Sequence, residues 1–373
     1  MKKTKVLSII GTRPEVIKMA PVIKECERRR ERFHQTIVLT GQHREMCRPF
    51  LELFSISPDW DLDIMRQDQT LNSIIGSILS TLPPVLAKVM PDIVLVQGDT
   101  SSAFAAALAA FHAKIAVGHV EAGLRTGTKY NPFPEEMNRA LIGRIADFHF
   151  APTKRARENL AEEGVASDRI FVTGNTSIDA LKMTLGASRE QRDRRLEGID
   201  LGTGRVIAVT THRRESFGKP LANTLLALKK IVAGYPDVQI VLPVHYNPNV
   251  RSQVYKILEG VERIHLIEPL EYRSFINLLD RAYLVLTDSG GVQEEAPSLG
   301  KPVLVLRETT ERPEGIDAGT ARLVGTNVEN IVKAVSTLLD DKQAYESMAC
   351  AVNPYGDGTA AVQIVDALER ELA

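Results

Sequence analysis

Residues 93–123 read IVLVQGDTSSAFAAALAAFHAKIAVGHVEAG, and this stretch contains the pattern that predicts the fold. Two apolar runs, 93–97 and 115–119, flank an alanine-rich segment with the composition of a helix. A strand, a helix and a second strand in this order are typical of a parallel sheet. Each run passes into a loop with a carboxylate, Asp99 after the first and Glu121 after the second.

A further pair of acids, Glu135 and Glu136, opens the helix predicted over residues 135–146. Charged groups at the ends of buried strands are costly unless they have a partner or a use. Taken singly, Asp99 and Glu135 also fit helix caps or first-turn acids. With Glu121, they make three acids within one short segment, which favours a chemical role.

The size and charge of the chain limit what it can be. Its 373 residues favour two domains, and 44% apolar and 25% charged residues are typical of a globular protein. A net charge of -1 offers no basic field, so we expect neither nucleic acid nor a membrane as partner.

The cysteines and the N-terminus indicate a cytoplasmic location. Cys26, Cys47 and Cys350 form no CxxC pair and no even framework, which fits a reducing compartment and argues against zinc. The apolar run 6–10 is too short for a signal peptide, and no run reaches the roughly 20 apolar residues of a membrane span.

The alternation of strands and helices occurs twice. Strands are predicted at 5–10, 36–40, 93–97, 115–119, 148–151 and 170–173, and after a charged stretch at 205–211, 239–243, 264–267, 284–287 and 302–306. One long sheet is the alternative, but the length and the charged break favour two Rossmann-like, doubly wound domains that face a cleft. The expected boundaries are 1–175, 176–355 and a closing helix in 356–373, which we expect to pack on the N-terminal domain.

Polar groups follow the predicted strands in both halves, and such strand ends bind ligands in open α/β sheets. Asp288-Ser289-Gly290-Gly291 follows an apolar strand and precedes a helix, where free N–H groups suit a phosphate. Glu295 could accept ribose hydroxyls. A diphosphate could be neutralised by four basic residues, Arg13, Lys18, His212 and Arg312.

Several cofactor motifs are absent from the sequence. No G-x-G-x-x-G follows a strand, so a dinucleotide cofactor is not expected, and Lys301 precedes Pro302 rather than completing a Walker loop. No HExxH or EF-hand loop occurs, so no metal site is expected.

Over nearly its whole length, the chain resembles the non-hydrolysing UDP-N-acetylglucosamine 2-epimerases of bacteria. The matching motifs are GTRPEVIKMAP from Gly11, GQHREM from Gly41, QGDT from Gln97, GHVEAGLRT from Gly118, PFPEEMNR from Pro132, THRRESFG from Thr211, PVHYNPNV from Pro243, DSGGVQEEAPSLGKPVLVLRETTERPE from Asp288 and NPYGDG from Asn353. This resemblance implies a glycosyltransferase-B-like fold, a homodimer and no redox cofactor.

The resemblance also implies a reaction and a set of residues. The family interconverts UDP-GlcNAc and UDP-ManNAc by elimination of UDP to 2-acetamidoglucal and re-addition. The implied catalytic residues are Asp99, Glu121, Glu135 and His212. The implied substrate-binding residues are Arg13, Lys18, Asp99, Glu121, His212, Phe275, Ser289, Gly290, Gly291, Glu295 and Arg312.

Bacterial members are also activated by UDP-GlcNAc bound beside the catalytic site. The matching residues of this second site are Gln42, His43, Arg66, Gln67, Glu136, Arg214 and His245. Four alternatives to the epimerase remain open from the sequence: a 2-epimerase of a modified UDP-sugar such as a diacetamido-uronate, a hydrolysing epimerase, a glycosyltransferase of the same fold, and a non-catalytic nucleotide-sugar sensor.

Overall fold

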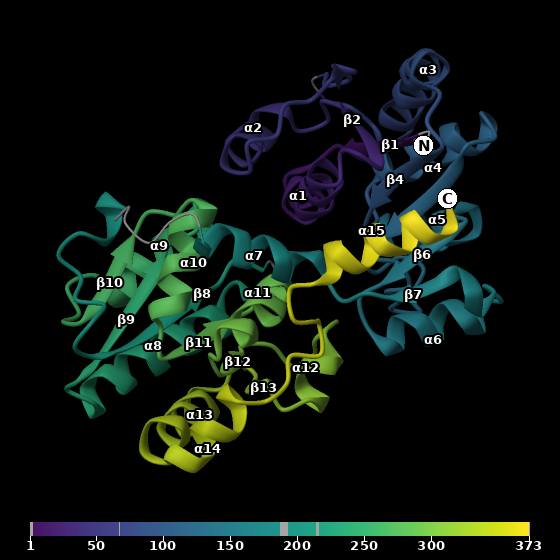
Figure 1. Cartoon of the computed structure of the whole chain (residues 1–373). Coiled ribbons are helices and arrows are strands. Elements are labelled where there is room, and N and C mark those ends of the chain that lie inside the picture. Colours follow the sequence, from purple (N-terminus) through teal and green to yellow (C-terminus); the bar gives the residue numbers. More distant parts are fainter. Residues whose placement is uncertain (1–2, 67, 187–192, 214–215, 373) are drawn as a thin grey trace. The chain divides into compact units, whose positions relative to one another are not determined.

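The computed structural model describes residues 3–66, 68–186, 193–213 and 216–372, which form two α/β units (Figure 1). The first unit combines residues 1–180 with residues 356–373, and the second comprises residues 181–355. One parallel sheet lies in each unit. The prediction of an α/β protein with two Rossmann-like sheets is therefore confirmed.

The first sheet has seven strands in the order β3-β2-β1-β4-β5-β6-β7. The strands are β1 (Thr4–Ile10), β2 (Phe33–Leu39), β3 (Trp60–Asp61), β4 (Ile93–Gln97), β5 (Ala116–Val120), β6 (Phe148–Ala151) and β7 (Ile170–Val172). The connecting helices are α1 (Arg13–Arg28), α2 (Arg44–Leu53), α3 (Leu71–Val89), α4 (Ser101–His112), α5 (Glu135–Ile145), α6 (Lys154–Glu162) and α7 (Thr176–Gly186). The order reverses between β1 and β4, and ligands of open α/β sheets bind at such a switch point.

Helices cover both faces of this sheet, and β1 shows this in its burial. Leu7 and Ile9 are buried in a core with α3 and α4, and the alternate residues Val6 and Ile10 are fully buried as well. Side chains of a strand alternate between faces, so a strand buried on both faces has no polar side. The alanines of α4 keep its backbone close to β4 and β5 and so help to fix the loop after β4.

The second sheet has six strands in the order β10-β9-β8-β11-β12-β13. The strands are β8 (Arg205–Thr210), β9 (Val238–Pro243), β10 (Ile264–Ile267), β11 (Leu284–Thr287), β12 (Val303–Val305) and β13 (Ala321–Leu323). The helices are α8 (Lys219–Gly234), α9 (Pro248–Leu258), α10 (Tyr272–Arg281), α11 (Gly290–Glu295), α12 (Pro313–Asp317), α13 (Val328–Asp340) and α14 (Lys342–Ala349). Here the switch point lies between β8 and β11.

Two separate cores lie on the faces of the second sheet. Ile207 and Val209 of β8 pack with α8, α9 and α13, whereas Val206 and Ala208 pack with α10 and α11. This alternation along one strand is the period-2 pattern of a sheet covered on both faces.

The last helix, α15 (Ala360–Glu371), belongs to the first unit and lies beside α1 (Figure 1). Arg29 at the end of α1 forms ion pairs with Asp366 at 2.6 Å and Glu369 at 3.2 Å. At the other end, the buried Asp179 carboxylate accepts hydrogen bonds from the N–H groups of Ala360 and Ala361. These contacts join the chain's last segment to its first half.

The structure adds elements that the sequence analysis did not predict. They are β3, β13, α2, α7, α12 and α14. Helix α3 continues through Pro83 and Pro84, and its buried face holds the turns on either side together. In the charged stretch between the two halves, residues 188–192 lie outside the described residues, and a short 3-10 turn, Arg194–Leu196, follows them.

Candidate active site

The loops after β4 and β5 lie side by side at the switch-point edge of the first sheet. The N–H of Gly98 donates to Val120 O at 3.0 Å, which ties the end of one strand to the end of the next. A Cβ atom on Gly98 would lie 3.7 Å from Oε2 of Glu121. The structure therefore brings together the loops of Asp99 and Glu121.

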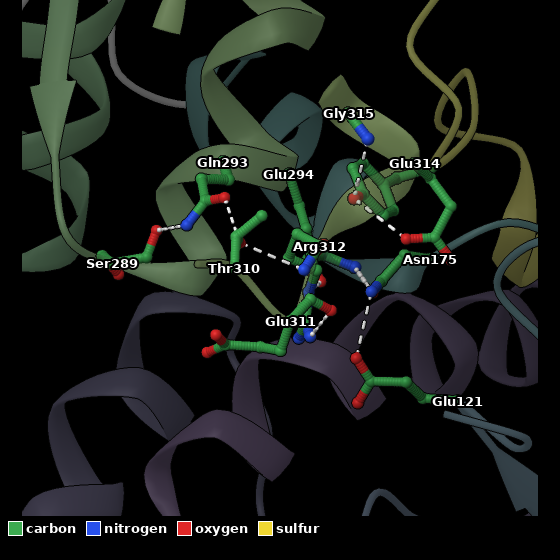
Figure 2. Close-up of polar contacts among 12 residues, drawn as sticks. Glu121, Asn175, Ser289, Gln293, Glu294, Thr310, Glu311, Arg312, Glu314 and Gly315 are labelled. Atoms are coloured by element: carbon green, nitrogen blue, oxygen red, sulfur yellow. Dashed lines mark hydrogen bonds and ion pairs between the residues drawn. The ribbon is translucent and has the colours of Figure 1, made fainter. Parts of the chain in front are cut away.

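Glu121 is a buried carboxylate in an unusual backbone conformation. It is 9% exposed and its φ angle is 65°, a left-handed value that is uncommon for a residue other than glycine. Its partners include the Lys18 ammonium, the Gln97 amide and the amide of Asn175, whose Nδ2 lies 3.0 Å from Oε1 (Figure 2). Such donors stabilise the ionised form of a buried acid.

Asp99 is held by helix α5. Both Nε and Nη2 of Arg139 contact its Oδ2, at 2.8 and 2.6 Å, and the Asn138 side chain donates to its backbone carbonyl at 2.8 Å. The neighbouring Thr100, not Asp99, caps α4, because its hydroxyl accepts from Ala103 N at 3.0 Å. The helix-cap explanation of Asp99 is therefore wrong.

Glu135 and Glu136 differ in their surroundings although both lie in the first turn of α5. The buried Glu136 carboxylate accepts from the N–H groups of Thr126 and Gly127 at 3.0–3.1 Å and fixes that loop. Among the residues that the structure describes, none donates a hydrogen bond to the Glu135 carboxylate or forms an ion pair with it. Glu135 is thus a first-turn acid, as the simpler explanation held, with its carboxylate available to a ligand.

The sequence analysis missed Glu15 as a site residue. Its carboxylate is 2% exposed and accepts from the N–H groups of Gly11 and Thr12 and from the hydroxyl of Thr100. It therefore connects the loop after β1 to the loop after β4. Burial raises the pKa of Glu15 to about 7, although the hydrogen bonds from Thr100 and the two N–H groups oppose this shift. Glu15 completes a capping box with Thr12, a sequence signal that could have identified it.

A buried histidine supports the loop of Asp99 from the opposite side. Nε2 of His119 lies 2.7 Å from Gly98 O, and a carbonyl can only accept, so Nε2 holds the proton. Burial lowers the pKa of His119 to about 3, so the ring stays neutral at physiological pH.

In the second unit, Asp288 organises the ends of β8 and β11. The fully buried carboxylate accepts from His212 N at 2.9 Å and Arg213 N at 3.0 Å, and Nδ1 of His212 lies 3.1 Å from its Oδ1. Burial acts to raise the pKa of Asp288, but His212 and the N–H donors hold it below its usual value. Asp288 thereby orients His212, whose side chain is 40% exposed.

The segment after Asp288, for which the sequence predicts a phosphate site, leads into helix α11. Ser289 is the N-cap of α11, but its hydroxyl makes no cap hydrogen bond, and a Cβ on Gly291 would meet no atom within 4 Å. The Gln293 amide donates to Ser289 O at 3.1 Å and accepts from the Thr310 hydroxyl at 2.7 Å (Figure 2). This bridge holds the loop before Arg312 against the start of α11.

The remaining predicted substrate residues are distributed over both units. Arg13 is exposed at the start of α1, with its guanidinium 5.9 Å from the Phe50 ring centre. Arg312 donates to the buried Glu294 (Figure 2). Glu295 accepts from the Tyr272 hydroxyl at 3.1 Å, and the partly buried Phe275 packs in the same core as Tyr272.

The residues of the implied second site also divide between the units. Gln42 accepts from the Ser102 hydroxyl, His43 is exposed at the N-cap of α2, and exposed Arg66 donates to Asp63 O and Met65 O. In the second unit, the His245 ring stacks on His212 with centres 6.0 Å apart. Gln67 and Arg214 lie outside the described residues.

Two further observations concern metals and membranes. Within the ranges described above, no group of three or more His, Cys, Asp or Glu side chains is arranged to hold a metal ion. None of the described helices combines the length and the apolar composition that crossing a membrane requires.

Comparison with known proteins identifies the family. The family model described as UDP-N-acetylglucosamine 2-epimerase matches residues 24–369. The chain belongs to this family. It is 52% identical to the UDP-N-acetylglucosamine 2-epimerase of Bacillus subtilis (strain 168), covering 99% of this chain and 96% of that protein, and 52% identical to that of Escherichia coli (strain K12), covering 98% of each.

Solved structures of the UDP-N-acetylglucosamine 2-epimerase family share this fold. The enzyme from Neisseria meningitidis, solved with UDP-GlcNAc bound, is 46% identical, with a TM-score of 0.89 over 99% of this chain and 100% of that one. A structure described as the glycotransferase of kitacinnamycin has a TM-score of 0.63 at 13% identity, over 99% and 100% of the two chains. At that identity the likeness shows the fold alone, and it supports the glycosyltransferase-B-like prediction.

Proposed function

We propose that this chain catalyses the reversible epimerisation of UDP-GlcNAc to UDP-ManNAc at C2. The observation that carries the proposal is the pair of acids on neighbouring strand ends, with Glu121 buried among Lys18, Gln97 and Asn175 and Asp99 held by Arg139. The family membership and the relative solved with UDP-GlcNAc support the choice of substrate.

The reaction we propose is an elimination followed by an addition. The C2 proton of the sugar is not acidic, so its loss is coupled to departure of UDP from C1, which gives 2-acetamidoglucal. Return of a proton to the opposite face of C2 and re-addition of UDP give the epimer. Asp99, Glu121 and Glu135 transfer the protons, because acid and base groups are needed at both faces of C2. The carboxylate of Glu135 has no partner in the described chain, which suits a group that must gain and lose a proton.

In this proposal the residues that the resemblance implies bind the UDP group. The N–H groups around Ser289, Gly290 and Gly291 donate hydrogen bonds to a phosphate at the start of α11, and Glu295 binds the ribose. Phe275 lies beside this nucleotide site. The cations that stabilise the leaving diphosphate are Arg13, Lys18, His212 and Arg312.

We further propose a second, activating UDP-GlcNAc site. The residues assigned to it are Gln42, His43, Arg66, Gln67, Glu136, Arg214 and His245. In the structure Glu136 already fixes the loop of Thr126 and Gly127, so an activator that contacts Glu136 would act on a loop next to Glu121. A sigmoidal rate curve, and ManNAc-direction turnover that needs added UDP-GlcNAc, would support this site, and hyperbolic kinetics in both directions would count against it.

We expect the enzyme to be a cytoplasmic homodimer. Cys26 and Cys47 are free and buried, and Cys350 is free and exposed, which suits a reducing compartment. The oligomeric state is checked by the mass of the purified protein in solution, for which a monomer would contradict the expectation.

Proton NMR of the purified chain with UDP-GlcNAc in deuterated water tests the proposed function. Deuterium at C2 together with UDP-ManNAc as the minority product is the expected result. Free ManNAc with UDP would indicate a hydrolysing epimerase instead. An unchanged UDP-GlcNAc would refute the proposal and favour a modified UDP-sugar or a transferase that awaits its acceptor.

A further inference from the structure

Arg139 contacts one oxygen of Asp99 twice. Its Nε lies 2.8 Å from Oδ2 and its Nη2 lies 2.6 Å from the same atom. No described residue donates to the other oxygen, Oδ1. The side chains of Arg139 and Asp99 are 13% and 25% exposed, so this ion pair is shielded from water more than an ordinary surface pair.

The same helix also holds the backbone of Asp99. Asn138, which precedes Arg139 and is 6% exposed, donates from Nδ2 to the Asp99 carbonyl at 2.8 Å. On the preceding peptide, His119 donates to the Gly98 carbonyl at 2.7 Å. Hydrogen bonds therefore fix the peptide groups on both sides of the Cα atom of Asp99. The remaining freedom is rotation of the carboxylate, which the contacts with Arg139 restrict.

Arg139 stands four residues after Glu135 in α5. Residues at this spacing lie on one face of a helix, about one turn apart. Helix α5 thus carries Glu135 and also binds the Asp99 carboxylate through Arg139. The helix therefore determines the spacing of two of the acids assigned to proton transfer.

We propose that Arg139 is a positioning residue of the epimerase, which occupies Oδ2 of Asp99 and leaves Oδ1 as the oxygen that exchanges a proton with C2 of the sugar. This inference rests on the proposed function. When Asp99 accepts the proton, the Oδ1–H bond forms and the C2–H electron pair becomes the C1=C2 bond. The C1–O electron pair then leaves with UDP, and in the reverse direction each of these changes is undone.

The other partner of Arg139 shows why its removal should act on Asp99. Nη1 of Arg139 lies 3.3 Å from Glu136, but Glu136 keeps the N–H donors of Thr126 and Gly127 without it. Asp99, in contrast, has no other side-chain donor among the described residues. Loss of Arg139 therefore frees the Asp99 carboxylate, whereas Glu136 still holds the loop of Thr126 and Gly127.

The chain offers a closely matched control. Arg125 forms an ion pair with Glu163 through Nε at 2.6 Å and Nη2 at 2.9 Å, and the two side chains are 11% and 29% exposed. This pair has similar burial, but Arg125 contacts both oxygens of its carboxylate, and the pair joins the loop after β5 to the end of α6. Arg125→Ala thus removes a comparable ion pair from the same unit.

The test compares Arg139→Ala, Arg139→Lys and Arg125→Ala at saturating UDP-GlcNAc. We expect Arg139→Ala to lower kcat about 100-fold, the cost of misplacing a reacting group, with KM and the UDP dissociation constant within about threefold. Arg139→Lys keeps a cation and should retain more of kcat. Added guanidinium ion should restore part of the kcat of Arg139→Ala and none of that of Asp99→Asn, which a merely structural role of Arg139 would not produce.

Three outcomes would overturn the inference. The first is a kcat of Arg139→Ala within about threefold of wild type, and the second is an equal loss of kcat in Arg125→Ala. The third is a loss of kcat in Arg139→Ala that matches the fraction of that variant that is unfolded. A wild-type chain that leaves UDP-GlcNAc unchanged would refute the proposed function, and this inference with it, because Asp99 would have no C2 proton to exchange. An active wild type with a fully active Arg139→Ala variant would refute the inference alone.

Discussion

At the scale of single residues, Glu15 is a buried acid whose protonation depends on folding. Its pKa in the folded chain is about 7, against an ordinary value of 4.5, and burial is the main cause. Between these values the folded chain holds a proton that the unfolded chain has released. The free energy of unfolding therefore falls as the pH rises through this window, by roughly 3 kcal/mol at most.

The substitution Glu15→Gln tests this dependence, because glutamine cannot titrate. We expect the wild type, relative to the variant, to lose thermal stability between about pH 5 and about pH 8. The neutral buried histidines His119 and His149 titrate in both proteins, so their contribution cancels in the difference. A difference in melting temperature that stays constant with pH would contradict the pKa of Glu15.

The three acids assigned to proton transfer yield a second prediction. Asp99→Asn, Glu121→Gln and Glu135→Gln should each lower turnover by at least about 100-fold, the range of general acid–base catalysis, while UDP binding remains. Glu163→Gln is the control, since it removes a part-buried, ion-paired acid of the same unit. Near-normal turnover in any of the three variants would exclude that residue from proton transfer.

The residue types and positions of these acids follow from the sequence, but their partners do not. Asp99 and Glu121 each follow a strand that the sequence predicts, and in the structure these two parallel strands are neighbours and end at the same edge of the sheet. That Asn175 reaches Glu121 across 54 residues, or that Arg139 reaches Asp99 across 40, depends on the packing of helices. No local pattern contains this information.

At the scale of elements, the loop after β5 approaches α6 so closely that only glycine fits at one position. Gly123 has φ of 87°, and a Cβ there would lie 2.2 Å from the Ala156 carbonyl oxygen. We expect Gly123→Ala to destabilise the protein by more than about 3 kcal/mol, since it combines backbone strain with overlap against a fixed backbone.

Gly127 provides the comparison for that prediction. Its φ is 72°, but a Cβ there would meet no atom within 4 Å. Gly127→Ala should therefore cost only about 1 kcal/mol, the strain of a left-handed alanine. Chemical denaturation of both variants measures the two values, and equal losses would show that the contact with Ala156 is unimportant.

The elements that sequence reasoning found and those it missed differ in length and regularity. Strands such as β1, β4 and β11 are mostly apolar because both faces are covered, and such runs are easy to recognise. The strands β3 and β13 have two and three residues, too few for any periodic signal. Helix α2 contains Pro49 and buries only Cys47 and Leu51, so its apolar pattern is weak.

At the scale of the whole molecule, the chain leaves the first unit and returns to it. Leu368 of α15 is fully buried, and Leu368→Ala should cost about 2–5 kcal/mol. Val362 of the same helix is 38% exposed, so Val362→Ala serves as a control with little expected effect. In the Leu368→Ala variant, amide hydrogen exchange should speed up more in residues 1–180 than in residues 181–355. Faster exchange confined to residues 181–355 would contradict the division into units.

The return of α15 has a consequence for the order in which the molecule can be completed. A ribosome makes residues 181–355 before it makes α15, so the second unit has all of its own residues first. Until then the side of α1 that contacts α15 lacks its covering helix, and Asp179 lacks the N–H groups of Ala360 and Ala361. The unit begun first is thus the unit finished last, and a nascent chain stalled before residue 356 would display an apolar surface on which chaperones could act.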